Sequence, residues 1–172
     1  RTAIYQYDVT HNLTKQTDAG NNIITYAYDS YGQMTGATDA NGNNSTYAYD
    51  ANGYKTKTVD ALSKTTAYAY DNLGNQTKMT DTEGRITSFL YDILNKLTKK
   101  TDALSNNYSY YYDKEGNLTK EADPNSNSTT NNYIFASREY FLSKKITPDS
   151  KTTEYNYDAA GNSTKVTNPD SN

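Results

Sequence analysis

The segment Tyr70-Asp71-Asn72-Leu73-Gly74-Asn75-Gln76-Thr77 defines the architecture of the chain, because its pattern returns at a fixed interval of 21 residues. Six Tyr-Asp pairs keep this interval, and a seventh follows a unit that is three residues longer. Such a period indicates a repeat architecture in which each unit packs on its neighbours. The pairs, whose tyrosines we call marker tyrosines, are Tyr7-Asp8, Tyr28-Asp29, Tyr49-Asp50, Tyr70-Asp71, Tyr91-Asp92, Tyr112-Asp113 and Tyr157-Asp158.

Each unit carries two turn signals. The first lies four residues after the marker tyrosine, where His11 and Asn95 replace glycine in two units. Because Gly, Asn and His tolerate positive φ, we expect a left-handed backbone there. A second turn follows another periodic aspartate, as in Asp18-Ala19-Gly20-Asn21. The glycines of the first turn are Gly32, Gly53, Gly74, Gly116 and Gly161.

The segments between turns alternate as β-strands do. In Ile24-Thr25-Tyr26-Ala27-Tyr28 the large residues share one face and the small residues share the other. No apolar stripe of helical period persists. We therefore expect one hairpin per unit, successive hairpins that continue one sheet, and tyrosines that form its core.

Residues 1–172 are expected to form a single array of about eight units, with residues 133–156 as a diverged unit that holds the insertion. Its apolar stretch 133–142 fits a longer loop best, although a partner-binding bulge or a plug remains an alternative. The sequence begins at Arg1, without Met or a signal peptide, which indicates a processed or excised piece. The two ends are complementary halves of one unit, as expected of a cut array or of chains joined head to tail.

The composition excludes several functional classes. Only 34% of residues are hydrophobic, 19 are Tyr, and the net charge is −3. The sequence contains no block of basic residues of the kind that binds nucleic acid, and no apolar run long enough to span a membrane. The absence of Cys excludes disulfides.

No catalytic, cofactor-binding or metal-binding residue is predicted. Recurring aspartates fit turns better than a singular catalytic pair, and Asp39-Ala40-Asn41-Gly42-Asn43 lacks the late Glu of a calcium loop. His11 stands alone as a titratable imidazole. Exposed tyrosines could stack on sugars, but a core role is the simpler interpretation. Four glycosylation sequons arise from the repeat frame itself, at Asn12, Asn75, Asn117 and Asn162.

The pattern Tyr-Asp-x-x-Gly-Asn-x-Thr, seen at 70–77 and 112–119, resembles the YD repeat of RHS proteins. That family includes polymorphic toxins, toxin-complex cage components, wall-associated proteins and teneurins. The resemblance implies an all-β fold of tandem 21-residue hairpin repeats, in a continuous antiparallel sheet that spirals as an open shell segment or filament. It also implies a hollow shell around cargo in toxin members. No sequence here resembles the self-cleaving core or cargo of those toxins.

These observations predict a non-enzymatic, extracellular or cell-surface structural protein that assembles head to tail as filament or shell. A segment of a toxin-encapsulating shell is the alternative, and a carbohydrate-binding adhesin is a second one. The expected partner is another copy of the chain, with cargo toxin or glycan as alternatives. Neither cofactor, nucleic acid nor membrane span is expected.

Overall fold

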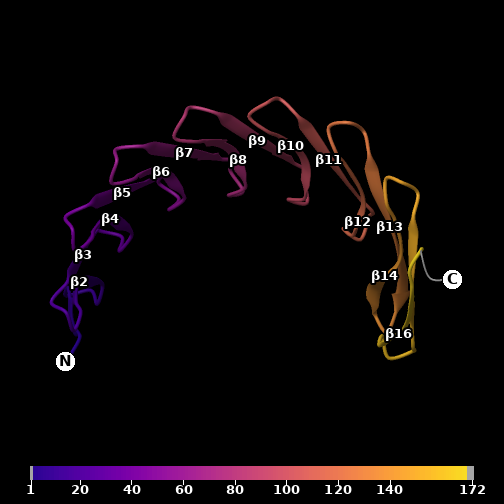
Figure 1. The fold of residues 1–172 in the computed structure, drawn as a ribbon, viewed down its shortest axis with the longest axis horizontal. Helices are drawn as coiled ribbons and strands as arrows, with labels where there is room; N and C mark the ends of the chain where they lie inside the picture. Colours follow the sequence, from indigo (N-terminus) through magenta and orange to yellow (C-terminus); the bar gives the residue numbers. More distant parts are fainter. Residues whose placement is uncertain (1, 170–172) are drawn as a thin grey trace. The chain divides into compact units, whose positions relative to one another are not determined.

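The computed structural model describes residues 2–169 and contains strands and turns, with no helix in that range. Its 16 strands form an open antiparallel sheet whose strand order is the chain order. This confirms the predicted all-β class of tandem hairpins (Figure 1). The chain divides into two compact units, Arg1–Ile86 and Thr87–Asn172. Each unit is described by itself.

The strands pair as consecutive hairpins, and the first strand of every hairpin except β13–β14 ends at a marker tyrosine. In the first unit the strands are β1 (Ile4–Tyr7), β2 (Leu13–Thr17), β3 (Ile23–Tyr28), β4 (Met34–Thr38), β5 (Asn44–Tyr49), β6 (Lys55–Val59), β7 (Thr65–Tyr70) and β8 (Gln76–Thr80). In the second they are β9 (Ile86–Tyr91), β10 (Leu97–Thr101), β11 (Asn107–Tyr112), β12 (Leu118–Ala122), β13 (Ser128–Ala136), β14 (Glu139–Ile146), β15 (Thr152–Tyr157) and β16 (Ser163–Thr167).

A β-bulge in each hairpin explains the threonine that recurs seven residues after the marker tyrosine. In β7–β8, Tyr70 pairs with Gln76 and Ala69 pairs with Lys78, so Thr77 has no partner across the strand. The Thr77 hydroxyl donates to the Ala69 carbonyl at 3.3 Å. A bulge bends the strand and adds twist, and here the hydroxyl bond holds it in place. The same bond is made by Thr14, Thr56, Thr98 and Thr119.

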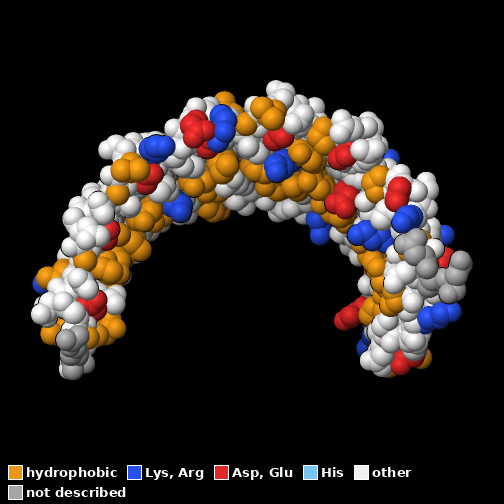
Figure 2. Space-filling view, viewed as in Figure 1, with side chains coloured by type: hydrophobic (Ala, Val, Ile, Leu, Met, Phe, Trp, Pro, Cys, Tyr) orange, Lys and Arg blue, Asp and Glu red, His pale blue; other side chains and the backbone are white. Residues whose placement is uncertain are grey.

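The side chains on the two faces of the sheet differ in size. Tyr26 and Tyr28 of β3 are half buried on one face, which we call the tyrosine face, whereas Thr25 and Ala27 are exposed on the other, which we call the back face. Figure 2 shows hydrophobic side chains gathered along one side within each of the two compact units.

The expected tyrosine core is wrong in one respect. No hydrophobic side chain of the described residues is fully buried. The hairpins form a single layer, so no second layer encloses the rings, and each tyrosine is covered only from the side by neighbouring hairpins.

The longer unit contains a longer hairpin, not a longer loop. Tyr133 keeps the place of a marker tyrosine opposite Leu142, and β13–β14 then continue to the pair Ala136–Glu139. The turn residues Ser137 and Arg138 both have positive φ, 50° and 70°, which is typical of a two-residue type I′ turn. The turn is tied to the next hairpin, because the Ser137 hydroxyl donates to the carbonyl of Ala159.

Candidate functional site

The Tyr-Asp motif is the candidate site, and its aspartate builds the turn that follows. One oxygen of Asp71 accepts the backbone N–H groups of Leu73 and Asn75, both at 2.9 Å. The other oxygen accepts from the Asn75 side-chain amide at 3.0 Å. The Asn75 side-chain bond is the main cause that lowers the pKa of Asp71. A carboxylate with three donors favours its charged form and holds the turn closed.

Both turns of a unit share this design, which the sequence revealed for only one of them. The residue three after the turn aspartate has positive φ in the first turn, as predicted, for example 85° at Gly74. The second turn needs the same conformation, and Ser63 adopts it at φ 62°. In Asp18-Ala19-Gly20-Asn21 the left-handed residue is Asn21, with φ 66°, and not Gly20. Serine at these positions conceals the signal that glycine gives elsewhere.

The marker tyrosine links its hairpin to the preceding one. The Tyr70 hydroxyl donates to the carbonyl of Lys55 at 3.0 Å, fifteen residues earlier and at the bulge of the previous hairpin. Burial of the ring is the main cause that raises the pKa of the Tyr70 hydroxyl. The equivalent bond is made by Tyr28, Tyr49, Tyr112, Tyr133 and Tyr157, to Leu13, Met34, Leu97, Leu118 and Leu142.

Replacing Tyr70 with phenylalanine should therefore lower the free energy of unfolding by about 1–2 kcal/mol, because the Lys55 carbonyl loses its donor inside the hairpin contact. Tyr31 is 88% exposed, so Tyr31→Phe is the matched control with an expected change below about 0.5 kcal/mol. Urea denaturation followed by circular dichroism measures both. Equal changes in the two variants would contradict the role of the hydroxyl bond.

A second contact between hairpins lies on the marker ring. The residue sixteen before a marker tyrosine packs on its ring and against the glycine that follows that tyrosine, as two pairs show. Tyr54 stacks on Tyr70 with ring centroids 5.1 Å apart and faces Gly74. Phe141 packs on Tyr157 at 5.0 Å, and its Cζ lies 2.6 Å from where a Cβ of Gly161 would stand. The glycine is thus needed both for φ and for space.

The other predicted residues have structural partners. The four repeat-frame sequon asparagines each donate from Nδ2 to the turn aspartate, as Asn12 does to Asp8 at 3.0 Å. His11 occupies its turn at φ 68°. Within residues 2–169 no group of three or more metal-ligating side chains gathers. The equivalent asparagine bonds join Asn75 to Asp71, Asn117 to Asp113 and Asn162 to Asp158. Glycosylation of these asparagines stays a prediction.

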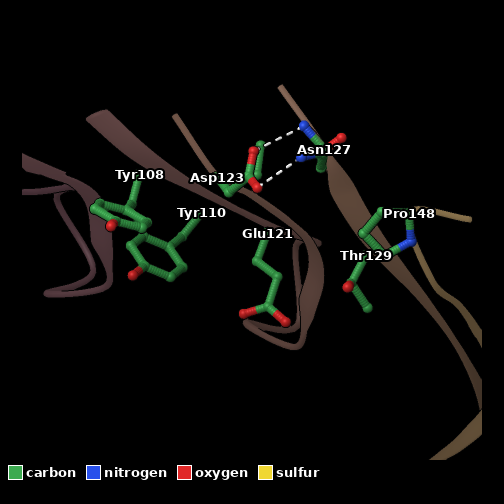
Figure 3. Close-up of a pocket in the computed structure, with 8 residues that line it drawn as sticks. Tyr108, Tyr110, Glu121, Asp123, Asn127, Thr129 and Pro148 are labelled. Carbon is green, nitrogen blue, oxygen red and sulfur yellow. Dashed lines mark hydrogen bonds between the residues drawn. The ribbon is translucent and has the colours of Figure 1, made fainter. Parts of the chain in front are cut away.

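A shallow pocket of about 170 Å³ lies on the tyrosine face of the second compact unit, Thr87–Asn172. Tyr108 and Tyr110 of β11 line one side, and Glu121 of β12 lies beside them (Figure 3). Asp123 also borders it, but both of its oxygens accept bonds from Asn127 at 2.8 Å. That carboxylate is therefore engaged in its turn. The pocket offers two rings and one uncommitted carboxylate, which suits weak stacking and not paired acid–base chemistry.

In the described part of the chain, no helix is long and apolar enough to cross a membrane. A family model described as RHS Repeat matches residues 7–44, 28–62, 49–86, 91–128 and 142–172. A search of curated proteins finds no match.

Several solved structures share the fold. A crystal structure of TcdB2-TccC3-Cdc42 matches with TM-score 0.61 and 21% identity, over 95% of this chain and 9% of that chain. The Photorhabdus luminescens Tc holotoxin pore matches with TM-score 0.61 and 20% identity, over 95% and 9%. TcdB2-TccC3 without its hypervariable C-terminal region matches with TM-score 0.60 and 21% identity, over 98% and 9%. The chain thus spans 9% of the length of these relatives, and the likeness establishes the fold alone.

Proposed function

Because this chain belongs to the RHS repeat family, we propose that it is an extracellular, non-enzymatic wall element in which hairpins laminate into a protective sheet. The observation that carries the proposal is the use of the motif itself. The marker hydroxyl and the marker ring both contact the preceding hairpin, as in Tyr70 with Lys55 and Tyr54. The tyrosines of the motif join neighbouring hairpins, and the aspartates hold the turns closed.

We propose further that this sheet is part of the wall of a shell. The likeness to Tc toxin structures over at least 95% of this chain supports a shell segment. A cargo protein held behind the wall is the partner that this role implies. A head-to-tail filament is the competing assembly, because the same lateral contacts could join successive copies.

Electron microscopy and light scattering of the purified protein test the assembly. A wall segment should give discrete particles whose mass does not grow with concentration. A filament should give fibres whose length grows with concentration, with a regular axial repeat of hairpins. Small-angle scattering that fits a compact sphere would contradict both, since a single-layer sheet has no thick core.

A glycan-binding adhesin is the second candidate, and the pocket beside Tyr108 and Tyr110 is the observation that favours it. Aromatic rings with a neighbouring carboxylate are suited to stack on and hydrogen-bond to a neutral sugar. Binding on a glycan array that disappears in Tyr110→Ala would support this function. Binding that survives this substitution would exclude the pocket as its site.

A further inference from the structure

The two margins of the sheet differ in their exposed apolar side chains. Because the antiparallel strands follow one another in chain order, the turns after the marker tyrosines lie along one margin and the remaining turns lie along the other (Figure 1). We call these the first-turn margin and the second-turn margin. In the second compact unit, the first-turn margin exposes Ile93, Leu94 and Phe135, whereas Leu104 is the large aliphatic side chain that the second-turn margin exposes.

The pair Ile93 and Leu94 is not needed to form the turn between β9 and β10. Other turns of this margin have Ala51-Asn52 or Lys114-Glu115 at the same two positions. The backbone of the turn is held by the Asp92 carboxylate, which accepts the Leu94 N–H at 2.8 Å. Ile93 is nonetheless 94% exposed and Leu94 is 62% exposed. The two aliphatic side chains therefore project into water from a closed turn that polar residues form equally well.

A second apolar tip lies on the same margin, at the end of the longer hairpin β13–β14. Phe135 is 63% exposed there, and its ring packs on that of Tyr140 with centroids 5.0 Å apart. The next hairpin braces this tip, because the Ser137 hydroxyl donates to the carbonyl of Ala159. The tips of β9–β10 and β13–β14 are four strand spacings apart along the sheet, about 19 Å. The margin thus presents two separate apolar tips.

We propose that the first-turn margin of the second compact unit attaches to the surface of a lipid bilayer, with these two tips inserted. Ile93, Leu94 and Phe135 would leave water for the boundary between headgroups and acyl chains, about 5–10 Å deep. Tyr140 combines an apolar ring with a hydroxyl, which suits the same boundary. The bond to Asp92 keeps the turn closed, so the aliphatic side chains enter while the carboxylate stays at the level of the headgroups.

A bilayer fits these tips better than a protein partner does. A stable protein interface buries about 800 Å² of surface on each side. Between the two apolar tips lies the turn of β11–β12, which carries the charged side chains of Lys114 and Glu115. Two small tips separated by a charged turn do not form a continuous apolar patch of that size. A fluid bilayer closes around each tip independently and leaves the charges among the headgroups.

The charges near the tips indicate which kind of lipid surface is involved. Lys114 is paired with Glu115 at 3.4 Å, and Arg138 is followed directly by Glu139. The basic residues at the three tips are Lys96, Lys114 and Arg138, and the acidic ones are Asp92, Asp113, Glu115 and Glu139. Because positive charge is not in excess, attachment should depend on apolar burial and not on anionic lipid. Vesicles of phosphatidylcholine, which have no net charge, are therefore the probe.

Sedimentation of the full chain with phosphatidylcholine vesicles tests the proposal. Ile93→Ala/Leu94→Asn gives this turn the Ala-Asn pair of residues 51–52, so circular dichroism should show an intact sheet. We expect this variant to lower the partition coefficient at least about tenfold. The matched control is Leu104→Asn, which gives a turn of the second-turn margin the Ala-Asn pair of residues 40–41. The control should change the partition coefficient by less than about twofold.

Fluorescence reports the depth of each tip, because the chain contains no Trp of its own. The emission of Leu94→Trp should shift to shorter wavelength when vesicles are added, and brominated lipid should quench it. The emission of Leu104→Trp, at the same position of a turn on the opposite margin, should stay unchanged. About 0.5 M NaCl should alter neither result, because screening weakens charge interactions and not apolar burial.

Equal losses in Ile93→Ala/Leu94→Asn and Leu104→Asn would overturn the proposal, as would failure of the folded wild type to bind vesicles. Binding that disappears in about 0.5 M NaCl would also overturn it, since attachment would then be electrostatic. Self-association of the wild type without lipid that is lost in the tip variant would assign this margin to a second copy of the chain instead. None of these outcomes depends on whether the hairpins form a shell or a filament.

Discussion

Replacing Gly74 with alanine should lower the free energy of unfolding by about 2–4 kcal/mol. Two separate effects combine at this position. Gly74 has φ +85°, a conformation that costs an L-residue about 1–2 kcal/mol. A Cβ built there also collides with the ring and hydroxyl of Tyr54, which stacks on Tyr70 and cannot move away without losing that contact. Urea denaturation measures the sum.

Gly84→Ala separates the two effects. Gly84 lies in the second turn with φ +78°, and nothing lies within 4 Å of its Cβ position. This variant should therefore lose only the backbone part, about 1–2 kcal/mol. Adding Tyr54→Ala to Gly74→Ala should remove the collision, so the double-mutant cycle should show a favourable coupling of about 1 kcal/mol or more. If Gly74→Ala and Gly84→Ala lost the same amount, the ring contact would have no bearing on this glycine.

Acidification should destabilise the whole array, because the same carboxylate cap recurs in almost every turn. Backbone donation from Asn12 is the main cause that lowers the pKa of Asp8 from 3.8 to about 2. A lowered folded pKa means that the stabilisation is complete above the unfolded value of 3.8 and is lost as the pH falls towards 2. The pKa is also lowered at Asp18, Asp39, Asp71, Asp81, Asp102, Asp113, Asp123, Asp149 and Asp158.

The urea midpoint should stay level between about pH 7 and pH 5 and then fall steeply below about pH 4. We expect the chain to be unfolded near pH 2 without urea, since the caps are lost together. Salt is the control: the shifts arise mainly from hydrogen bonds, so about 0.5 M NaCl should leave the shape of the curve unchanged. A midpoint that remained constant down to pH 2 would show that protonated aspartates close these turns equally well.

The local structure was accessible from the sequence because turn chemistry acts over a few residues. The Tyr-Asp period, the two turns per unit and the positive φ at Gly74 all follow from residues close to one another in the chain. The left-handed conformation of the second turn does not follow from residue type, since serine, as at Ser63, rarely adopts it.

Spacing and turn residues are local properties, so a series of β-hairpins can be predicted from the amino-acid sequence alone. The contacts between hairpins appear only in the folded chain. The Tyr70 hydroxyl donates to the Lys55 carbonyl, and the ring of Tyr54 stacks on the ring of Tyr70. The folded chain also leaves the tyrosines half exposed, because the hairpins form a single layer. The physical reason is register, because partners two strands apart are selected by how one hairpin aligns on the next.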